Sequence, residues 1–263
     1  MKQVLLCLLL MLFSTQLSAE KYIVGAQNIG YYPHYDFSAS EDKGVGWAIL
    51  EAFSAHSGHE FIYLSMPIRR LQLELLKGHV DFVYPDNPGW YNQVTKNTDK
   101  YFSSPLTNAI TGTFVSKDNT GNTMARIKRI AMPLGFTPVN WQQQVDKKQT
   151  KLVWVSDIEA GMWLVQKRRV DAIDLEMHVA SHISKNVNGL APLTLDLTLP
   201  HNEIPFMLSS LRHKGIIDEL NQFIENNPNK IREIKNTYGI ISFRKLKPEL
   251  MKEQRVSEAQ VWQ

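Results

Sequence analysis

A strand–helix–strand–helix–strand pattern occurs twice along this chain, and this repetition constrains the fold more than any other feature. The first occurrence predicts strands and helices in alternation at 21–27, 45–57, 60–66, 68–77 and 80–84. The second predicts the same order at 129–133, 138–148, 151–156, 158–168 and 170–175. Alternation of this kind is typical of parallel sheets covered by helices. The sequence therefore predicts an α/β protein built from two units of similar size.

The two units share a local motif, in which a helix ends at a polar turn and Val-Asp leads into a buried strand. Gly78 ends the helix of the first unit, where a left-handed residue is favoured, and Val80-Asp81 follows. In the second unit the corresponding pair is Val170-Asp171. We expect Asp81 and Asp171 to lie at the strand starts in a structural role.

The remaining segments connect and close the two units. We expect a joining strand at 110–116 and a short returning strand at 204–209. A helical region at 214–236, interrupted near 226–228, follows them. The charged tail at 244–263 is weakly helical and its packing is not predicted.

The first 19 residues have the organisation of a secretory signal peptide. Lys2 precedes an apolar run from Val4 to Phe13, and a small polar segment ends at Ala19. A membrane-spanning helix needs about 20 apolar residues, so this shorter run predicts export with cleavage after Ala19. We therefore expect a soluble protein of the periplasm.

Composition narrows the classes of partner. The only cysteine, Cys7, lies within the leader, so the exported chain would have no disulfide. The formal net charge is +3, without a charge block or a basic stripe, which argues against a nucleic-acid partner. The chain is rich in aromatic residues, several of them in polar segments, as suits a small-molecule site. We expect a monomer with a small-molecule ligand.

Motifs that carry catalysis or bind cofactors are absent from the sequence. There is no phosphate-binding loop, no dinucleotide-binding glycine fingerprint and no Gly-x-Ser-x-Gly motif. His178 and His182 are four residues apart and near Glu176, so they could share a helix face. Zinc needs three or four converging ligands, and no further motif supplies them. We therefore predict no catalytic residue, no cofactor and no metal.

Four segments together carry a resemblance to a known family. They are an aromatic-proline loop, a leucine-rich helix with its Gly turn and Val-Asp, a Tyr-Phe-Ser-Ser-Pro segment, and closing helices that end in Tyr-Gly, at 31–37, 70–81, 101–106 and 220–239. In these segments and their order the chain resembles the extracellular solute-binding proteins of family 3. These are type 2 periplasmic binding proteins for polar amino acids and similar small solutes.

The resemblance implies a two-lobed α/β fold, each lobe a mixed sheet with flanking helices, joined by two crossing strands. Lobe one would comprise 20–113 and 207–263, and lobe two 114–206. The ligand would lie between the lobes at the carboxyl ends of strands, and closure would be a hinge motion at 111–115 and 205–208. The implied partner is an inner-membrane ABC permease. The alternatives are a sensing module for a membrane receptor and a dehydratase-like enzyme on the same fold.

The chain departs from the family at one informative place. Amino-acid binders of the family usually carry an Arg shortly before the Phe-Ser-Pro segment, where it clamps a carboxylate bidentately. The stretch from Asp86 to Lys100 contains no Arg. This departure argues against a plain α-amino acid as the ligand.

Seven residues are the candidate ligand contacts. Arg70 lies in the first turn of a helix, where the helix dipole disfavours a cation; it would clamp an anionic group or pair with a local acid, while Arg69 would face solvent. Glu176 would take the amino group of the ligand, with Asp174 as the fallback, or it would cap the following helix. The other five would form an aromatic cage for a cationic or flat ligand: Tyr32, Tyr35, Phe37, Trp90 and Tyr101.

Overall fold

The structure is a computed structural model that describes residues 20–90 and 93–261, with the backbone alone from residue 253 onward. The signal peptide predicted for residues 1–19 lies outside this part, as do residues 91 and 92. None of the helices it describes combines the length and the apolar character that crossing a bilayer requires.

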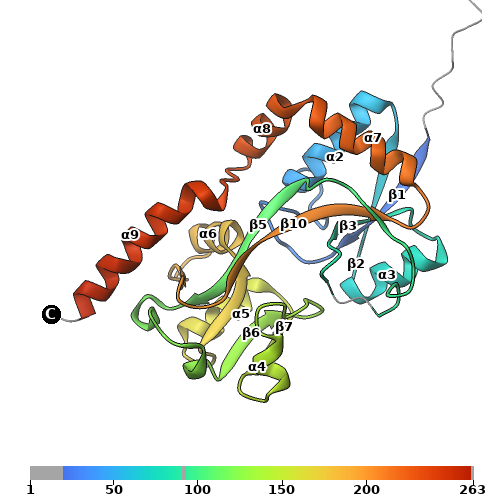
Figure 1. The fold of residues 1–263 in the computed structure, drawn as a ribbon. Coiled ribbons are helices and arrows are strands. Elements are labelled where there is room, and N and C mark those ends of the chain that lie inside the picture. Colours follow the sequence, from blue (N-terminus) through green and yellow to red (C-terminus); the bar gives the residue numbers. More distant parts are fainter. Residues whose placement is uncertain (1–19, 91–92, 262–263) are drawn as a thin grey trace, which may run out of the picture.

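The first lobe begins with an α/β unit, shown in blue and cyan in Figure 1. Its elements are β1 (Lys21–Gln27), α2 (Val45–Ser57), β2 (Glu60–Met66), α3 (Ile68–Lys77) and β3 (Phe82–Asp86). Strand β1 lies between β2 and β3 and is parallel to both. The first four elements have the predicted bounds, and Gly78 ends α3 with φ 76° as expected. Strand β3 starts two residues later than predicted.

The delay in β3 has a counterpart in the second lobe, and both come from the Val-Asp motif. Asp81 stands before β3, and its Oδ2 accepts a hydrogen bond of 2.7 Å from the backbone N–H of Ile23 on β1. Asp171 stands before β8, and its Oδ2 accepts one of 2.7 Å from the N–H of Arg129 on β6. The predicted structural role of both aspartates is confirmed: each fixes the start of a neighbouring strand.

The second lobe repeats the arrangement. Its elements are β6 (Arg129–Pro133), α4 (Gln142–Asp146), β7 (Lys151–Val155), α5 (Ile158–Gln166), β8 (Ala172–Glu176) and α6 (Met177–Asn186), with short 3-10 turns at Lys117–Asn119 and Met124–Arg126 before them. Strand β6 is parallel to both β7 and β8. Helix α4 is shorter than the predicted 138–148, because a turn occupies residues 138–141 and Lys148 has a positive φ of 57°.

Two long antiparallel strands, β5 (Thr107–Val115) and β10 (His201–Ser210), cross from one lobe to the other (Figure 1). Strand β10 pairs with β3 at its first-lobe end, and β5 pairs with β8 at its second-lobe end. The strand order is β2-β1-β3-β10-β5-β8-β6-β7, with β4 (Tyr101–Phe102) added to β10 and β9 (Thr194–Leu195) to β5. The predicted crossing strands at 110–116 and 204–209 are thus present and longer. The lobe boundaries near 113 and 207 stay a prediction.

Three helices close the chain: α7 (Lys214–Asn226), α8 (Pro228–Thr237) and α9 (Phe243–Val261). In Figure 1, α9 runs away from α8 alongside the second lobe. The ring Nε2 of His178 on α6 accepts a hydrogen bond of 3.1 Å from the N–H of Ile241, and the ring of Phe243 meets that of His201 edge-on. The start of the tail, whose packing was not predicted, therefore rests on the second lobe.

One glycine shows how closely the first lobe is packed. A Cβ atom at Gly46, in the first turn of α2, would lie 1.9 Å from the Oη of Tyr84 on β3. Only glycine allows the helix to approach the strand this closely. Tyr84 belongs to the large apolar core that includes Val24, Phe53 and Phe82.

Candidate functional site: a cleft between the lobes

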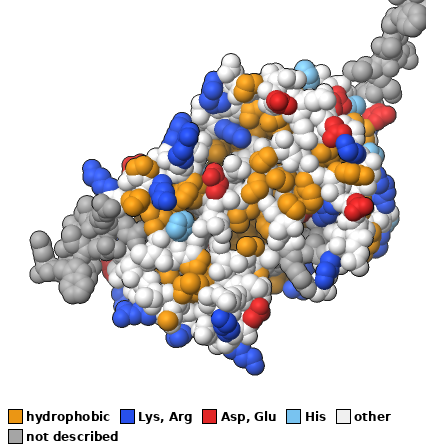
Figure 2. Space-filling model, viewed as in Figure 1, with side chains coloured by type: hydrophobic (Ala, Val, Ile, Leu, Met, Phe, Trp, Pro, Cys, Tyr) orange, Lys and Arg blue, Asp and Glu red, His pale blue; other side chains and the backbone are white. Residues whose placement is uncertain are grey.

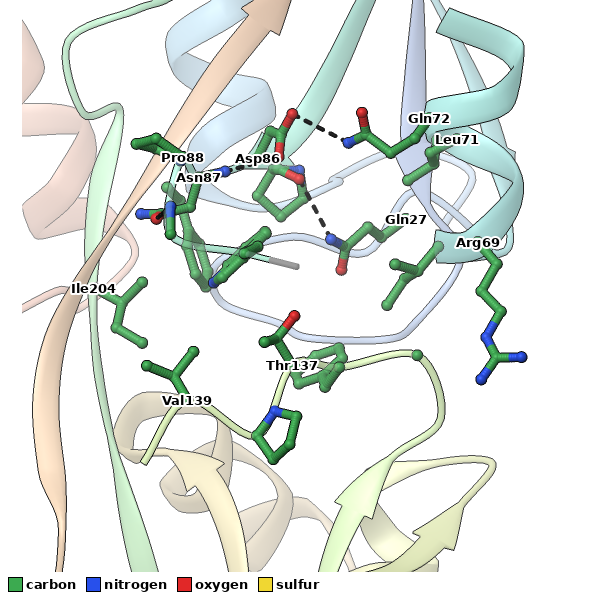
Figure 3. A pocket seen from close by; sticks show the side chains of 18 of the residues that line it. Gln27, Arg69, Leu71, Gln72, Asp86, Asn87, Pro88, Thr137, Val139 and Ile204 are labelled. Atoms are coloured by element: carbon green, nitrogen blue, oxygen red, sulfur yellow. Dashed lines mark hydrogen bonds between the residues drawn. The ribbon is translucent and has the colours of Figure 1, made fainter. Parts of the chain in front are cut away.

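A cleft of about 1460 Å³ opens where the two lobes face each other across the crossing strands. Its first-lobe wall comes from the end of β1, the start of α3 and the segment 85–102; its second-lobe wall comes mainly from 132–146. Thr111, Ile204 and Phe206 of the crossing strands line its back. Figure 2 shows hydrophobic side chains gathered over the middle of this face, and Figure 3 shows Thr137 and Val139 opposite Gln27 and Asn87.

The position of the cleft follows from the topology. Gln27 ends β1 and Asp86 ends β3, and the carboxyl ends of parallel strands meet at one edge of a sheet. Open α/β sheets bind ligands at this edge. The predicted location of the ligand site therefore coincides with a real cleft.

A closed polar network forms part of the first-lobe wall. The Nζ of Lys100 lies 2.8 Å from the Oδ2 of Asp86, and the same oxygen accepts hydrogen bonds from Gln72 (3.1 Å) and Ser209 (2.6 Å). Lys100 also donates to the Oε1 of Gln72 at 2.8 Å. Figure 3 shows Gln72 directed at Asp86. The network neutralises the charge of Lys100 and ties the segment after β3, which carries Trp90, back onto the sheet.

Aromatic rings cover much of the remaining surface. Tyr31 stacks on Tyr35 at 5.3 Å between ring centres and reaches Phe136 of the second lobe at 5.5 Å. Trp90 meets Phe206 of β10 edge-on at 5.7 Å. The Oη of Tyr35 donates to the Oε1 of Gln27 at 2.7 Å, so this ring is held rigidly. Burial raises the pKa of the Tyr31 and Tyr35 hydroxyls well above their usual range, so both stay neutral.

Asp174 on β8 is a half-buried carboxylate of the second lobe that lines the cleft. Within the part of the chain that the structure describes, no side chain forms a hydrogen bond or an ion pair with it. Burial raises its pKa to about 7. Its charge acts on the hydroxyl of Tyr31, whose pKa it raises further. The cleft thus contains a carboxylate without a protein counter-charge.

Of the seven sequence-predicted contacts, Tyr35 and Trp90 line the cleft. Tyr32 instead donates to the Oδ2 of Asp42 at 3.1 Å and packs on the ring of His182. Phe37 is a core residue that packs against Tyr63. Tyr101 pairs with Ser210 in the β4–β10 ladder. The structure therefore does not bring these five aromatic residues together as one cage.

The two arginines of α3 have different surroundings. Arg70 forms an ion pair of 3.3 Å with Glu74 one turn later, and its side chain is 65% exposed. This is the local-pair alternative for Arg70. Arg69, expected to face solvent, is exposed but lines the rim of the cleft, where Figure 3 shows its side chain directed away from Gln27 and Gln72.

Glu176 lies behind the cleft wall and is fully buried. Its Oε2 accepts from the N–H of Val179 at 2.8 Å, so it caps α6, as one of the two alternatives held. Its Oε1 accepts from the N–H of Ile110 at 3.1 Å and lies 3.2 Å from the Nε2 of His34 in the first lobe. Burial alone would raise its pKa, but His34 and His178 outweigh burial and hold the pKa well below its usual range.

The same cluster has the composition of a metal site, because donor atoms of His34, Glu176 and His178 lie within 4.8 Å of one another. The protonation of the His178 ring decides whether the cluster can bind a metal. Its Nε2 accepts the N–H of Ile241, so its Nδ1 carries the proton and donates to the Oε1 of Glu176 at 2.8 Å. A metal needs the lone pair of that nitrogen. The arrangement fits a carboxylate that is hydrogen-bonded to His178 and lies at ion-pair distance from His34 of the other lobe, and we assign no metal to it.

Several lining residues escaped the sequence-based prediction. Asp86 lies two residues beyond the predicted strand at 80–84, so it was not expected at a strand end, and Lys100 lies in a stretch in which only the lack of an arginine was interpreted. Phe136 and Phe206 lie in an irregular loop and in a crossing strand, and nothing in their local sequence marks them. Only the folded topology brings them beside Tyr31 and Trp90.

Comparisons with known proteins agree with this architecture. No family model matches the chain, and no curated protein matches it. Among solved structures, the substrate-binding protein of an amino acid ABC transporter is 19% identical, with a TM-score of 0.64 over 83% of this chain and 98% of that one. The GluR0 ligand-binding core in complex with L-glutamate is 16% identical, with a TM-score of 0.68 over 84% and 99%. A histidine kinase sensor domain with similarity to periplasmic binding proteins is 13% identical, with a TM-score of 0.67 over 84% and 96%.

These identities show the fold and nothing finer. The chain has the two-lobed α/β fold of the periplasmic binding proteins, with two crossing strands between the lobes. The fold implied by the family resemblance of the sequence is confirmed.

Proposed function

We propose that the protein is a periplasmic solute-binding protein, which captures a small polar solute in the interlobe cleft without transforming it. The observation that carries the proposal is the cleft itself: both lobes line it, and it combines aromatic walls with a few polar groups. A ligand there touches both lobes and stabilises their closed arrangement. The contacts we propose are Gln27, Tyr35, Asn87, Trp90 and Asp174.

Binding is favoured over a dehydratase-like reaction by the charges in the cleft. Such a reaction on a carboxylate substrate needs a cation to clamp the substrate and an acid to donate a proton. Asp174, with a pKa near 7, has the properties of the acid. The buried cation, Lys100, is already engaged by Asp86 and Gln72. The clamp is therefore missing from the described part of the cleft.

Delivery to an inner-membrane ABC permease is the role we propose first. Sensing for a membrane receptor is the second candidate, and one observation supports it. The backbone of Ile241, just before α9, is hydrogen-bonded to His178 of the second lobe, while α8 packs on α2 of the first lobe. A helix connected to both lobes is moved by their closure, as a relay to a receptor requires.

The test is a thermal-shift screen of amino acids, amines, carboxylates, sugars and short peptides, since a ligand that binds the folded state raises the melting temperature. Small-angle scattering with each hit should show a smaller radius of gyration. A screen without any hit, or saturation without compaction, contradicts the proposed function. Once a ligand is found, the ligand-bound protein is reconstituted with a permease or with the periplasmic domain of a receptor to identify its partner.

A further inference from the structure

The charged side chains that line the cleft differ in their exposure and in whether they are paired. Arg69, Lys96, Asp99 and Asp146 are exposed at the rim. Asp86 and Lys100 are less than a tenth exposed and neutralise each other. Asp174 is the remaining group: it is half-buried and receives no hydrogen bond or ion pair from any described side chain. Apart from the exposed rim, the described charges of the cleft are therefore one positive charge short.

A partly buried carboxylate without a partner is unfavourable, and a cation at hydrogen-bond distance removes this cost. Tyr31 lies beside Asp174, and the hydroxyl of Tyr31 is affected by its charge. Tyr31 also stacks on Tyr35 and meets Phe136 across the cleft. Tyr31 and Tyr35 are almost fully buried, so a cationic group placed near Asp174 would meet the half-buried ring of Phe136 instead, which adds cation–π attraction.

The same walls provide for the rest of the ligand. Phe206 contacts Tyr31, Tyr35 and Trp90, so it joins these rings of the first lobe into one apolar cluster. On the second lobe, Val139 and Trp154 line the cleft with nearly half of each side chain exposed. A flat apolar body would cover these surfaces.

Away from the exposed rim, a carboxylate on the ligand has no free cation to pair with among the described residues of the cleft. To pair with Lys100, it would have to displace the carboxylate of Asp86, which Lys100, Gln72, Ser209 and the N–H of Asn87 all bind. It would also lie in a space that already holds the charges of Asp86 and Asp174. Like charges at short distance in a desolvated site repel.

We propose that the cleft selects organic amines: a cation held by Asp174 beside the ring of Phe136, attached to an aromatic or similarly flat body, without a carboxylate. This inference rests on the proposed solute-binding function and specifies its ligand.

Matched compounds test it directly. Phenethylamine, L-phenylalanine and 3-phenylpropionate share a ring and differ in the amine and the carboxylate; tryptamine, L-tryptophan and indole-3-propionate do the same for a larger ring. Calorimetric titration at pH 7.5 should show the amine binding at least tenfold more tightly than its amino acid in one of the two series. The propionates should show no binding. If neither amine binds more tightly than its amino acid, the proposal is wrong.

A variant pair isolates Asp174. Asp174→Asn keeps the size of the side chain and should weaken amine binding at least tenfold. Asp146→Asn removes a carboxylate from the exposed rim of the same cleft and should leave the affinity unchanged. Retained amine affinity in Asp174→Asn overturns the proposal, provided that circular dichroism shows the variant folded; Asp174→Ser serves if it is not.

The outcomes separate this inference from the proposed function. If amino acids or carboxylates bind and compact the protein while the amines do not, the ligand class is wrong and the solute-binding function stands. If no compound of any class binds, both fail.

Discussion

The Nζ of Lys100 lies 2.8 Å from the Oδ2 of Asp86, and less than a tenth of either side chain is exposed. The two residues stand at the two ends of the segment that connects β3 to β4. Their ion pair therefore neutralises both charges and also holds the ends of this segment together. Because the pair is buried, each partner depends on the other.

Removing one partner of this pair should cost more than removing both. Asp86→Asn or Lys100→Met leaves a buried charge unpaired, and each should lower the free energy of unfolding by about 3–5 kcal/mol. The double variant should lose less than the sum of the two, because no charge remains unpaired. Urea denaturation measures all three. Simple additivity would show that the pair is not coupled.

Asp174 should make the stability depend on pH in an unusual direction. Its pKa is raised to about 7, so the folded state holds the proton more tightly than the unfolded state does. Its contribution is full below its ordinary pKa near 4 and is lost as the pH rises to 7, by at most about 1.4 kcal/mol for each pH unit. The difference in stability between Asp174→Asn and wild type should therefore be more favourable to the variant at pH 8 than at pH 4.5.

Melting temperatures at pH 4.5 and 8 test this prediction. The facing hydroxyls of Tyr31 and Tyr35 stay neutral throughout that interval, because burial raises their pKa. Asp146→Asn, a change of the same chemistry at the exposed rim, is the control. An Asp174→Asn difference that is the same at both pH values would contradict the assignment.

Glu176 should act in the opposite sense. Its pKa lies well below the usual range, because His34 and His178 outweigh the effect of burial. Its stabilisation is therefore complete above the ordinary glutamate pKa and is lost as the pH falls below it. Glu176→Gln should lower the free energy of unfolding at pH 7 by about 1–3 kcal/mol, since hydrogen bonds to a charge are weakened. The loss should shrink at pH 3.

Urea denaturation at both pH values measures the effect, with Glu225→Gln on the exposed face of α7 as the control. Since Glu176 does not line the cleft, ligand affinity should be unchanged once a ligand is known. An affinity loss without a stability loss would return Glu176 to the ligand site.

Two tyrosines of one aromatic cluster should respond oppositely to the same change. The Oη of Tyr84 is buried without a hydrogen-bond partner among the described residues, whereas that of Tyr35 donates to Gln27. Tyr84→Phe should raise the free energy of unfolding by about 1 kcal/mol, because a desolvated hydroxyl is removed. Tyr35→Phe should lower it by a similar amount. Equal responses would show that the Tyr84 hydroxyl is bonded, for example to water.

Trp90 should report ligand binding. Its ring lines the cleft and contacts Phe206, so a bound ligand changes its surroundings. Ligand addition should change the intrinsic fluorescence, and Trp90→Phe should remove most of that change. Trp163→Phe, on α5 outside the cleft lining, should leave it intact. A full signal in Trp90→Phe would locate the reporter at another tryptophan.

Local sequence signals were sufficient for most of the fold. Helix α2 was predicted to the residue because Gly58 adopts a left-handed conformation that ends it. Helix α3 was equally well defined, since Pro67 precedes it and Gly78 follows. Helix α6 was expected only as the helix that Glu176 would cap, without bounds, because Glu176 is also the last residue of strand β8. A residue with two structural roles gives no clear boundary signal.

The site was harder to predict, because most of its surface is assembled from distant segments. Neighbouring residues on a helix are rotated by about 100° from each other. Arg69 therefore lines the cleft, whereas Arg70 pairs with Glu74. Similarly, Asp174 and Glu176 are two residues apart, and only one lines the cleft. Choosing between such neighbours requires the position of the opposite lobe, which sequence periodicity does not contain.

The place of β10 in the sheet also bears on how the chain is made. Ser209 of β10 donates a hydrogen bond to Asp86 of β3 across 123 residues of sequence, and the strands of the second lobe lie between them in the chain. During synthesis the ribosome therefore releases β6, β7 and β8 before the strand that completes the first sheet. The three parallel strands of the first lobe are all present by then, but β3 keeps an unpaired edge until β10 emerges. Until then the first lobe exposes the backbone N–H and C=O groups of an edge strand, which can pair with another chain.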